Sequence, residues 1–204
     1  MQNHPGSSDE ESLEIIAKES GPHSFSANQF EVVKRVVQAT ADFDFVKNMV
    51  FHPVAVEAGM AAIRAGADIV TDIQMVAVGI SKDRLAKRGG SVWCFVTDDD
   101  VLKTAKELSL PREIAAMRKA AEVCEGAIYV IGNTPAALLE LIRLVREGKA
   151  KPSLIVGVPV GFVSAAESKE QLLANSTPFI TCRGRKGGSA VAVAVINALS
   201  LLAV

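Results

Sequence analysis

Short apolar runs alternate with longer amphipathic stretches along most of the chain. Five of the runs are nearly continuous in apolar residues, which is typical of strands covered on both faces of a parallel sheet. They predict strands over 67–73, 91–96, 127–132, 153–160 and 178–182. Helical periodicity predicts helices over 11–19, 27–39, 53–65, 99–108, 111–124, 134–147, 164–174 and 187–202. Alternating strands and helices favour an α/β fold with a mainly parallel sheet.

Helix ends carry recognisable signals. Thr134 followed by Pro135 predicts an N-cap with proline in the first turn, and Ser164 offers a second capping hydroxyl. Gly66 and Gly148 directly follow predicted helices, where a left-handed residue is favoured.

The domain organisation is simple. A chain of 204 residues is the size of one α/β domain, and we assign 11–204 to it. Residues 1–10 are polar and acidic, so we expect a flexible N-terminal tail that does not resemble a secretory signal.

The composition and net charge limit the kinds of partner that the protein can bind. Apolar residues make up 49% of the chain and the net charge is −1, so there is no broad basic field for nucleic acid or an anionic membrane. The apolar C-terminal run, 189–204, is shorter than the roughly 20 residues that span a bilayer, so we expect a buried helix. Three cysteines without metal-ligand spacing favour a reducing, cytoplasmic location.

Ligands of parallel sheets bind beyond the carboxyl ends of the strands. That rule selects the segments 71–75, 97–100, 132–135, 157–162 and 183–188. The last of these, "RGRKGG", lacks the Walker spacing, and no G-x-G-x-x-G follows a strand. Two interpretations stay open for it: glycines that allow close packing at a helix start, or cations and backbone N–H groups that bind carboxylates.

Other chemistries find little support in the sequence. The three histidines have no partners at metal-ligand spacing, so we predict no metal site. The aspartates of 97–100 fit a helix cap better than a cation site. No nucleophile–base pair is recognisable beside Ser164 or Ser189.

Taken together, several segments carry a family resemblance. They include "VVKRVVQATADFDF" (32–45), "AGADIVTDIQMVAVGI" (65–80), "IGNTPAALLELI" (131–142), "KPSLIVGVPVGFVSAAESKEQL" (151–172) and "RGRKGGSAVAVAVINAL" (183–199). In order and spacing the chain resembles the precorrin-8X (cobalt-precorrin-8) methylmutase family.

The resemblance implies a flavodoxin-like three-layer α/β/α sandwich and a homodimer whose active sites take residues from both subunits. It also implies an isomerase of cobalamin biosynthesis, which moves a methyl group from C11 to C12 of the corrin precursor without a redox cofactor or a metal. The substrate carries many carboxylates, so the resemblance favours the anion-binding interpretation of 183–188.

Site residues follow from the same match. The implied substrate-binding residues are Ser12, Thr71, Asp72, Gln74, Met75, Arg112, Asn133, Arg183 and Arg185. Arg112 lies in "PREIAAM", which departs from the family's usual "TRSAAAM". For Asn133, capping of the helix that begins near Thr134 is an equal alternative.

One catalytic position departs from the family pattern. Where the family reads R-x-x-H-A, with histidine as the proton donor, this chain has Gln38. An amide donates hydrogen bonds but does not deliver a proton near neutral pH. The sequence therefore leaves open an active divergent enzyme, an inactive variant, and a corrinoid-binding protein. A flavin or nucleotide binder is a further alternative that rests on the fold alone.

Overall fold

The computed structural model describes residues 5–204, in which six strands form one sheet with the order β1-β6-β5-β4-β2-β3. The pairings among β2 to β6 are parallel, and β1 runs antiparallel to β6. The strands are β1 (Met49–Phe51), β2 (Ile69–Thr71), β3 (Val92–Trp93), β4 (Ile128–Ile131), β5 (Leu154–Gly157) and β6 (Phe179–Cys182). Without β1, this is the flavodoxin-like order 2-1-3-4-5.

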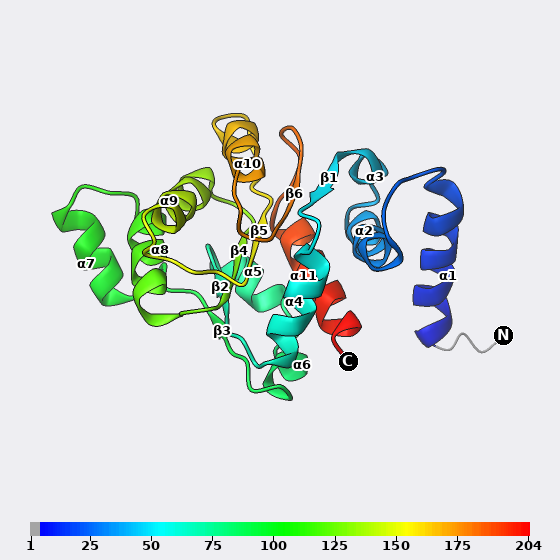
Figure 1. Cartoon of the computed structure of the whole chain (residues 1–204), viewed down its shortest axis with the longest axis horizontal. Helices are drawn as coiled ribbons and strands as arrows, with labels where there is room; N and C mark the ends of the chain where they lie inside the picture. The colour runs from blue at the N-terminus through cyan, green and yellow to red at the C-terminus, as the bar shows by residue number, and fades with distance from the viewer. Residues whose placement is uncertain (1–4) are drawn as a thin grey trace.

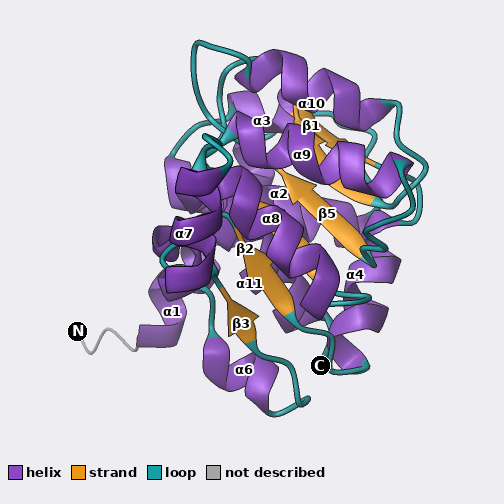
Figure 2. Cartoon of the chain, turned by 90° about the vertical axis from the view of Figure 1, so that its left-hand side faces the viewer, coloured by secondary structure: helices purple, strands orange, loops and turns teal. Residues whose placement is uncertain are grey.

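Helices cover both faces of the sheet and complete three layers (Figure 1). One layer contains α2 (Ala27–Thr40), α4 (Ala55–Arg64), α5 (Gln74–Gly79) and α11 (Ser189–Leu202), with α1 (Pro5–Glu19) packed on α2. The other contains α7 (Asp99–Glu107), α8 (Arg112–Val123), α9 (Pro135–Arg146) and α10 (Ala165–Leu173). Figure 2 views the molecule from the side of α7 and α8. The predicted α/β/α sandwich is confirmed.

Side chains of each strand alternate between two cores. In β4, Ile128 and Val130 face the core of α2, α4 and α11, whereas Tyr129 and Ile131 face the core of α8 and α9. This alternation follows from the two-residue period of a strand. Because both faces are covered, all four residues are at most 1% exposed.

The C-terminal helix α11 belongs to this core. Its 14 residues pack on α2, α4 and α5, and Val191, Val195 and Leu199 are fully buried. Among the helices of residues 5–204, none combines the length and apolarity that crossing a bilayer requires.

All five predicted strands and all eight predicted helices are present, with ends shifted by a few residues. The largest shift is in α1, which begins at Pro5 instead of residue 11, so part of the expected flexible tail is helical; residues 1–4 lie outside the described residues. The sequence analysis missed β1 and three short helices, α3 (Asp44–Asn48), α5 and α6 (Lys82–Ala86).

One carboxylate joins two neighbouring strands at the carboxyl edge. Asp72, directly after β2, accepts hydrogen bonds from the backbone N–H groups of Gly132, Asn133 and Thr134 at 3.0, 2.8 and 2.8 Å. These three residues form the turn between β4 and α9, so Asp72 holds the turn that leads into α9, including the N–H of the N-cap residue Thr134. The strands β2 and β4 flank the point at which the strand order reverses, where α/β folds bind ligands.

Asp72 is fully buried, so its carboxylate is held by the protein alone. Burial raises the pKa of the Asp72 carboxyl, and the three N–H donors oppose that rise. The capping alternative for Asn133 has no support among the described residues, because the polar contact of its side chain is the Thr134 hydroxyl at 3.4 Å. Thr134 occupies the predicted N-cap position, but its hydroxyl makes no capping bond.

We predict that Asp72→Asn lowers the free energy of unfolding by about 2–3 kcal/mol. In either orientation of the new amide, its NH₂ group faces a backbone N–H donor, and a buried donor loses its acceptor. Urea unfolding of both proteins measures the change. Asp83→Asn in the exposed helix α6 is the control and should shift stability by less than about 0.5 kcal/mol. Equal stability of the Asp72 variant and the unaltered protein would contradict this role.

Candidate active site

The carboxyl edge of the sheet gathers loops from distant parts of the sequence. The segments that follow β2, β3, β4, β5 and β6 meet there because these strands are parallel. The antiparallel strand β1 brings its amino end to the same edge, where the Arg183 N–H donates to the Asn48 carbonyl at 2.8 Å. The segment after α2 thus lies beside the glycine-rich loop 183–188.

The segment after β2 divides into buried and exposed positions. Thr71 is 1% exposed, and its hydroxyl donates to the Trp93 carbonyl at 3.2 Å. Gln74 is exposed, and its amide lies 3.4 Å from the Cys94 carbonyl. Met75 is 70% exposed. Thr71 and Asp72 therefore hold the edge together, whereas Gln74 and Met75 are accessible from solvent.

Asn133 is exposed beside this segment. Its side-chain NH₂ lies 3.4 Å from the Thr134 hydroxyl, and its backbone N–H donates to Asp72. Because Asn133 is exposed on a loop that Asp72 fixes, a ligand over β2 and β4 can reach its side chain.

The glycine-rich loop presents two arginines and holds a lysine. Arg183 pairs with Glu170 at 3.2 Å, and the guanidinium of Arg185 lies 5.3 Å from the centre of the Phe162 ring. Both arginines are exposed, and they retain N–H groups for an anionic ligand. The ammonium of Lys186 lies 2.6 Å from carboxylates of the segment after α2.

Gln38 lies near the end of α2 and is bound on two sides. Its Nε2 donates to Asp9 Oδ1 at 2.8 Å, and Arg35 Nη1 donates to its Oε1 at 3.1 Å. Arg35 also forms an ion pair with Asp9 at 2.8 Å, and this contact lowers the pKa of the Asp9 carboxyl. Because Asp9 only accepts and Arg35 only donates, the orientation of the amide is fixed and one N–H remains available.

Gln38 borders two hollows. One, of about 270 Å³, lies between α1 and α2 and is also lined by Ser12. The other, of about 460 Å³, runs along α2 and α11 and is also lined by Arg84 and Asn197. The structure thus brings Ser12 and Gln38 to one hollow, although the Ser12 hydroxyl donates to the Ser8 carbonyl of its own helix.

Arg112 is remote from Gln38 within one chain. It begins α8, its side chain is 53% exposed, and its polar contact is its neighbour Glu113 at 3.3 Å. In Figure 1, α8 lies toward the left-hand end of the molecule and α1 and α2 toward the right-hand end.

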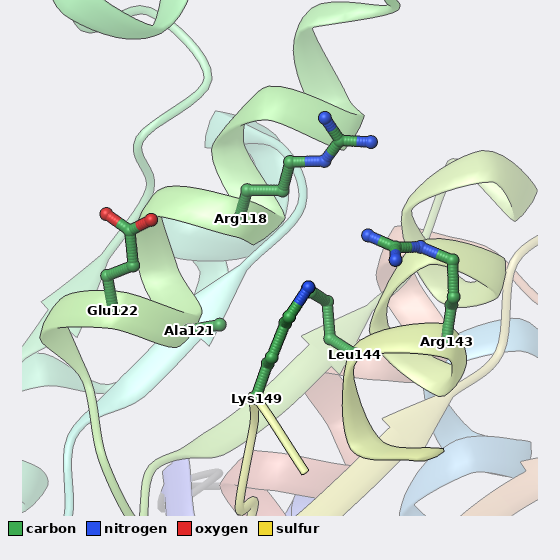
Figure 3. Close-up of a pocket in the computed structure, with 6 residues that line it drawn as sticks. All are labelled: Arg118, Ala121, Glu122, Arg143, Leu144 and Lys149. Atoms are coloured by element: carbon green, nitrogen blue, oxygen red, sulfur yellow. The ribbon is translucent and has the colours of Figure 1, made fainter. Parts of the chain in front are cut away.

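Another hollow, of about 570 Å³, lies between α8 and α9 (Figure 3). Arg118, Arg143 and Lys149 line it, but each is paired with a carboxylate. Glu140, 7% exposed, accepts from both arginines, and the Arg143 guanidinium lowers its pKa. The local charge is balanced by the protein, so this hollow does not suit a polyanion.

Sequence reasoning missed Asp9 and Arg35 as partners of Gln38. Arg35 precedes Gln38 by three residues on one helix face, which is a signal in the sequence. Asp9 has no comparable signal, because its contact depends on how α1 packs on α2.

Comparison with known proteins gives one consistent result. The family model described as Precorrin-8X methylmutase matches residues 9–202. A cobalt-precorrin-8 methylmutase of Priestia megaterium is 53% identical over 192 residues, which cover 94% of this chain and 85% of that protein. A precorrin-8X methylmutase of Pseudomonas aeruginosa is 42% identical over 192 residues, covering 93% and 92%.

A solved structure agrees. The precorrin-8X methylmutase from Thermus thermophilus superimposes with a TM-score of 0.92 and 42% identity, over 97% of this chain and 96% of that one. The matched region contains the carboxyl edge, the glycine-rich loop and Gln38. The chain therefore belongs to the precorrin-8X methylmutase family.

Proposed function

We propose that the protein is an isomerase of cobalamin biosynthesis that moves a methyl group from C11 to C12 of precorrin-8X or cobalt-precorrin-8. The observation that carries this proposal is the similarity over residues 9–202, which includes each segment at the carboxyl edge. The relatives reported above have methylmutase names, with and without cobalt in the substrate. These names do not favour the alternative of a corrinoid-binding protein without activity.

The proposed roles follow from what each side chain offers. The C11–CH₃ bond breaks and the C12–CH₃ bond forms within one bound molecule, so positioning supplies much of the catalysis. We assign the macrocycle to the carboxyl edge, with Ser12, Gln74, Met75 and Asn133 against it. Arg183 and Arg185 bind the carboxylates of its side arms.

Gln38 is proposed to face the macrocycle as a hydrogen-bond donor. Its remaining N–H stabilises a ring nitrogen or carboxylate but transfers no proton. Thr71 and Asp72 act differently from the sequence-based expectation: both are buried and bonded to the protein, so we propose that they support the site without touching the ligand. No redox cofactor or metal takes part in the proposed reaction.

We also propose a homodimer in the cytoplasm. Within one chain, α8, which begins at Arg112, and α2, which contains Gln38, lie toward opposite ends of the view in Figure 1. In the proposed dimer, Arg112 of one copy lies at the site that contains Gln38 of the other. Apolar surface beside the site supports this arrangement: Met75 and Val78 on α5 are 70% and 76% exposed. Exposed apolar residues next to a site are typical of subunit interfaces.

Incubation of the unaltered protein with precorrin-8X, followed by absorbance spectroscopy, tests the proposed reaction. Methyl migration changes the conjugated system, so the spectrum should become that of hydrogenobyrinic acid. Tight product binding without any spectral change of the substrate would instead favour a binding protein.

Gln38→His should raise turnover by about 10²–10⁴-fold, the usual effect of a general acid. Imidazolium carries the proton, so the gain should be greatest at low pH and fade as pH rises through the histidine pKa. The Asp9 carboxylate extends the gain upward in pH, because an adjacent anion favours the charged imidazole. The pH–rate profile of both proteins measures this, with Gln171→His on the exposed face of α10 as the control. An unaltered rate in the Gln38 variant would show that another group supplies the proton.

Arg112→Ala should weaken binding of hydrogenobyrinic acid by about 1.5–3 kcal/mol, the scale of a hydrogen bond to a charged group. Arg112→Lys should restore part of the affinity, since an ammonium lacks the planar fork of a guanidinium. Calorimetric titration compares these variants with Arg146→Ala, an exposed arginine at the far end of α9. A dissociation constant unaffected by Arg112→Ala would remove this residue from the site.

Analytical ultracentrifugation should give twice the 21.5 kDa mass of one chain. Val78→Glu should shift the equilibrium toward monomer, because it places a charge in the proposed interface. Val123→Glu, which replaces a similarly exposed valine at the end of α8, should leave the dimer intact. A monomeric unaltered protein at micromolar concentration would contradict the proposed assembly.

A further inference from the structure

A buried lysine lies beneath the glycine-rich loop. Lys169 on α10 is 0% exposed, and its Nζ donates to the Lys186 carbonyl at 2.6 Å. Its second polar contact is the Cys182 sulfur at 3.6 Å. The Cys182 thiol also donates to the Lys186 carbonyl, at 3.1 Å. Two buried donors therefore converge on one backbone oxygen of the loop.

Burial makes this position energetically unfavourable for a lysine. Removal from water disfavours an ammonium, and burial accordingly lowers the pKa of Lys169. Among the described residues, its polar partners are the backbone carbonyl of Lys186 and the sulfur of Cys182, and neither is a carboxylate. An apolar side chain of the same volume would fill the space without this cost. The contact that such a side chain would lose is the one to the loop.

The same loop is held at several other points. The Gly188 N–H donates to the Val158 carbonyl at 2.8 Å, and the Arg185 carbonyl accepts from Gly161 at 3.1 Å. A Cβ at Gly187 would approach the Val158 carbonyl to 2.3 Å, so the backbone there lies directly on the loop after β5. Two parts of Lys186 are therefore fixed. Its carbonyl accepts from Lys169, and its ammonium forms ion pairs with Asp42 and Asp44.

The direction of one peptide plane follows from these contacts. In a trans peptide the carbonyl and the next N–H point to opposite sides. The Lys186 carbonyl points toward Lys169 in the interior, so the Gly187 N–H points away from it. A backbone N–H that points away from the interior, beside the exposed Arg183 and Arg185, suits a carboxylate ligand.

We propose that Lys169 is a positioning residue that fixes the Lys186–Gly187 peptide so that the loop presents the Gly187 N–H to a side-arm carboxylate of the substrate. The substrate's identity rests on the function proposed above, whereas the fixing of the loop does not depend on it. Lys169 acts only through the loop and touches no reacting atom.

Lys169→Met tests the proposal, because methionine has a similar volume and lacks the donor. The first measurement is trypsin cleavage of the native protein after Arg183, Arg185 and Lys186, followed by mass spectrometry. The second is titration with hydrogenobyrinic acid. We expect cleavage at these bonds to accelerate by about 10-fold, since local opening becomes easier. The dissociation constant should rise by roughly 10-fold, the effect of one lost hydrogen bond in a charged site.

Stability and kinetics separate positioning from a general structural role. The melting temperature should not fall, since no amine remains to be buried. KM should rise while kcat stays within about 3-fold, because the loop binds substrate equally in the ground and transition states. Cys182→Ala, which removes the other donor to the same carbonyl, should have a smaller effect in the same direction. Ser168→Ala, a neighbouring buried residue bonded only within α10, is the matched control.

Each contrary result is distinct. A lower melting temperature with an unchanged KM would make Lys169 a structural residue and overturn the proposal, as would unaltered cleavage of the loop. Faster cleavage with unaltered product affinity would overturn its link to binding. If the unaltered protein does not bind the product at all, the proposed function fails, and the cleavage rates still decide whether Lys169 holds the loop. If Lys169→Met does not fold, Cys182→Ala decides by the same two measurements.

Discussion

The carboxyl edge of this protein depends on the three hydrogen bonds that the Asp72 carboxylate accepts from the start of α9. A buried carboxylate without donors would be unstable, and a turn without an acceptor would leave three backbone N–H groups unpaired. The N–H groups compensate the carboxylate for its lost hydration, and the carboxylate in turn satisfies the N–H groups. The contact also fixes the ends of β2 and β4 relative to each other, at the point where the strand order reverses and a ligand site can form.

Other buried or ion-paired side chains fix further loops at the carboxyl edge. Lys169 holds the carbonyl of Lys186, and two aspartates after α2 hold its ammonium. Asp9 and Arg35 fix the amide of Gln38. The exposed groups that keep hydrogen-bonding capacity suit a large anionic ring: two arginines, an asparagine and one amide N–H. Because the supporting contacts form on folding, a ligand meets loops that are already ordered, and less of its binding energy is spent on ordering them.

The sequence predicted the layers better than the contacts. Strands β2 and β4 to β6 are continuous apolar runs buried on both faces, which is a local signal. The missed strand β1 has only three residues, and so short an apolar run does not distinguish a strand from a helix. Thr71 and Asp72 were correctly placed at the strand end, but their burial depends on partners 22 and 60 or more residues away. No local pattern distinguishes a residue that touches a ligand from one that supports the loop beneath it.

A crystal structure of the protein with hydrogenobyrinic acid is the most direct test of where the ligand lies. We predict that the macrocycle covers the carboxyl edge, with the remaining N–H of Gln38 within hydrogen-bond distance and side-arm carboxylates on the Arg183–Arg185 segment. Asp72 should keep its three backbone bonds and make no contact with the ligand. A ligand seated between α8 and α9, or a Gln38 amide turned away from the macrocycle, would contradict it.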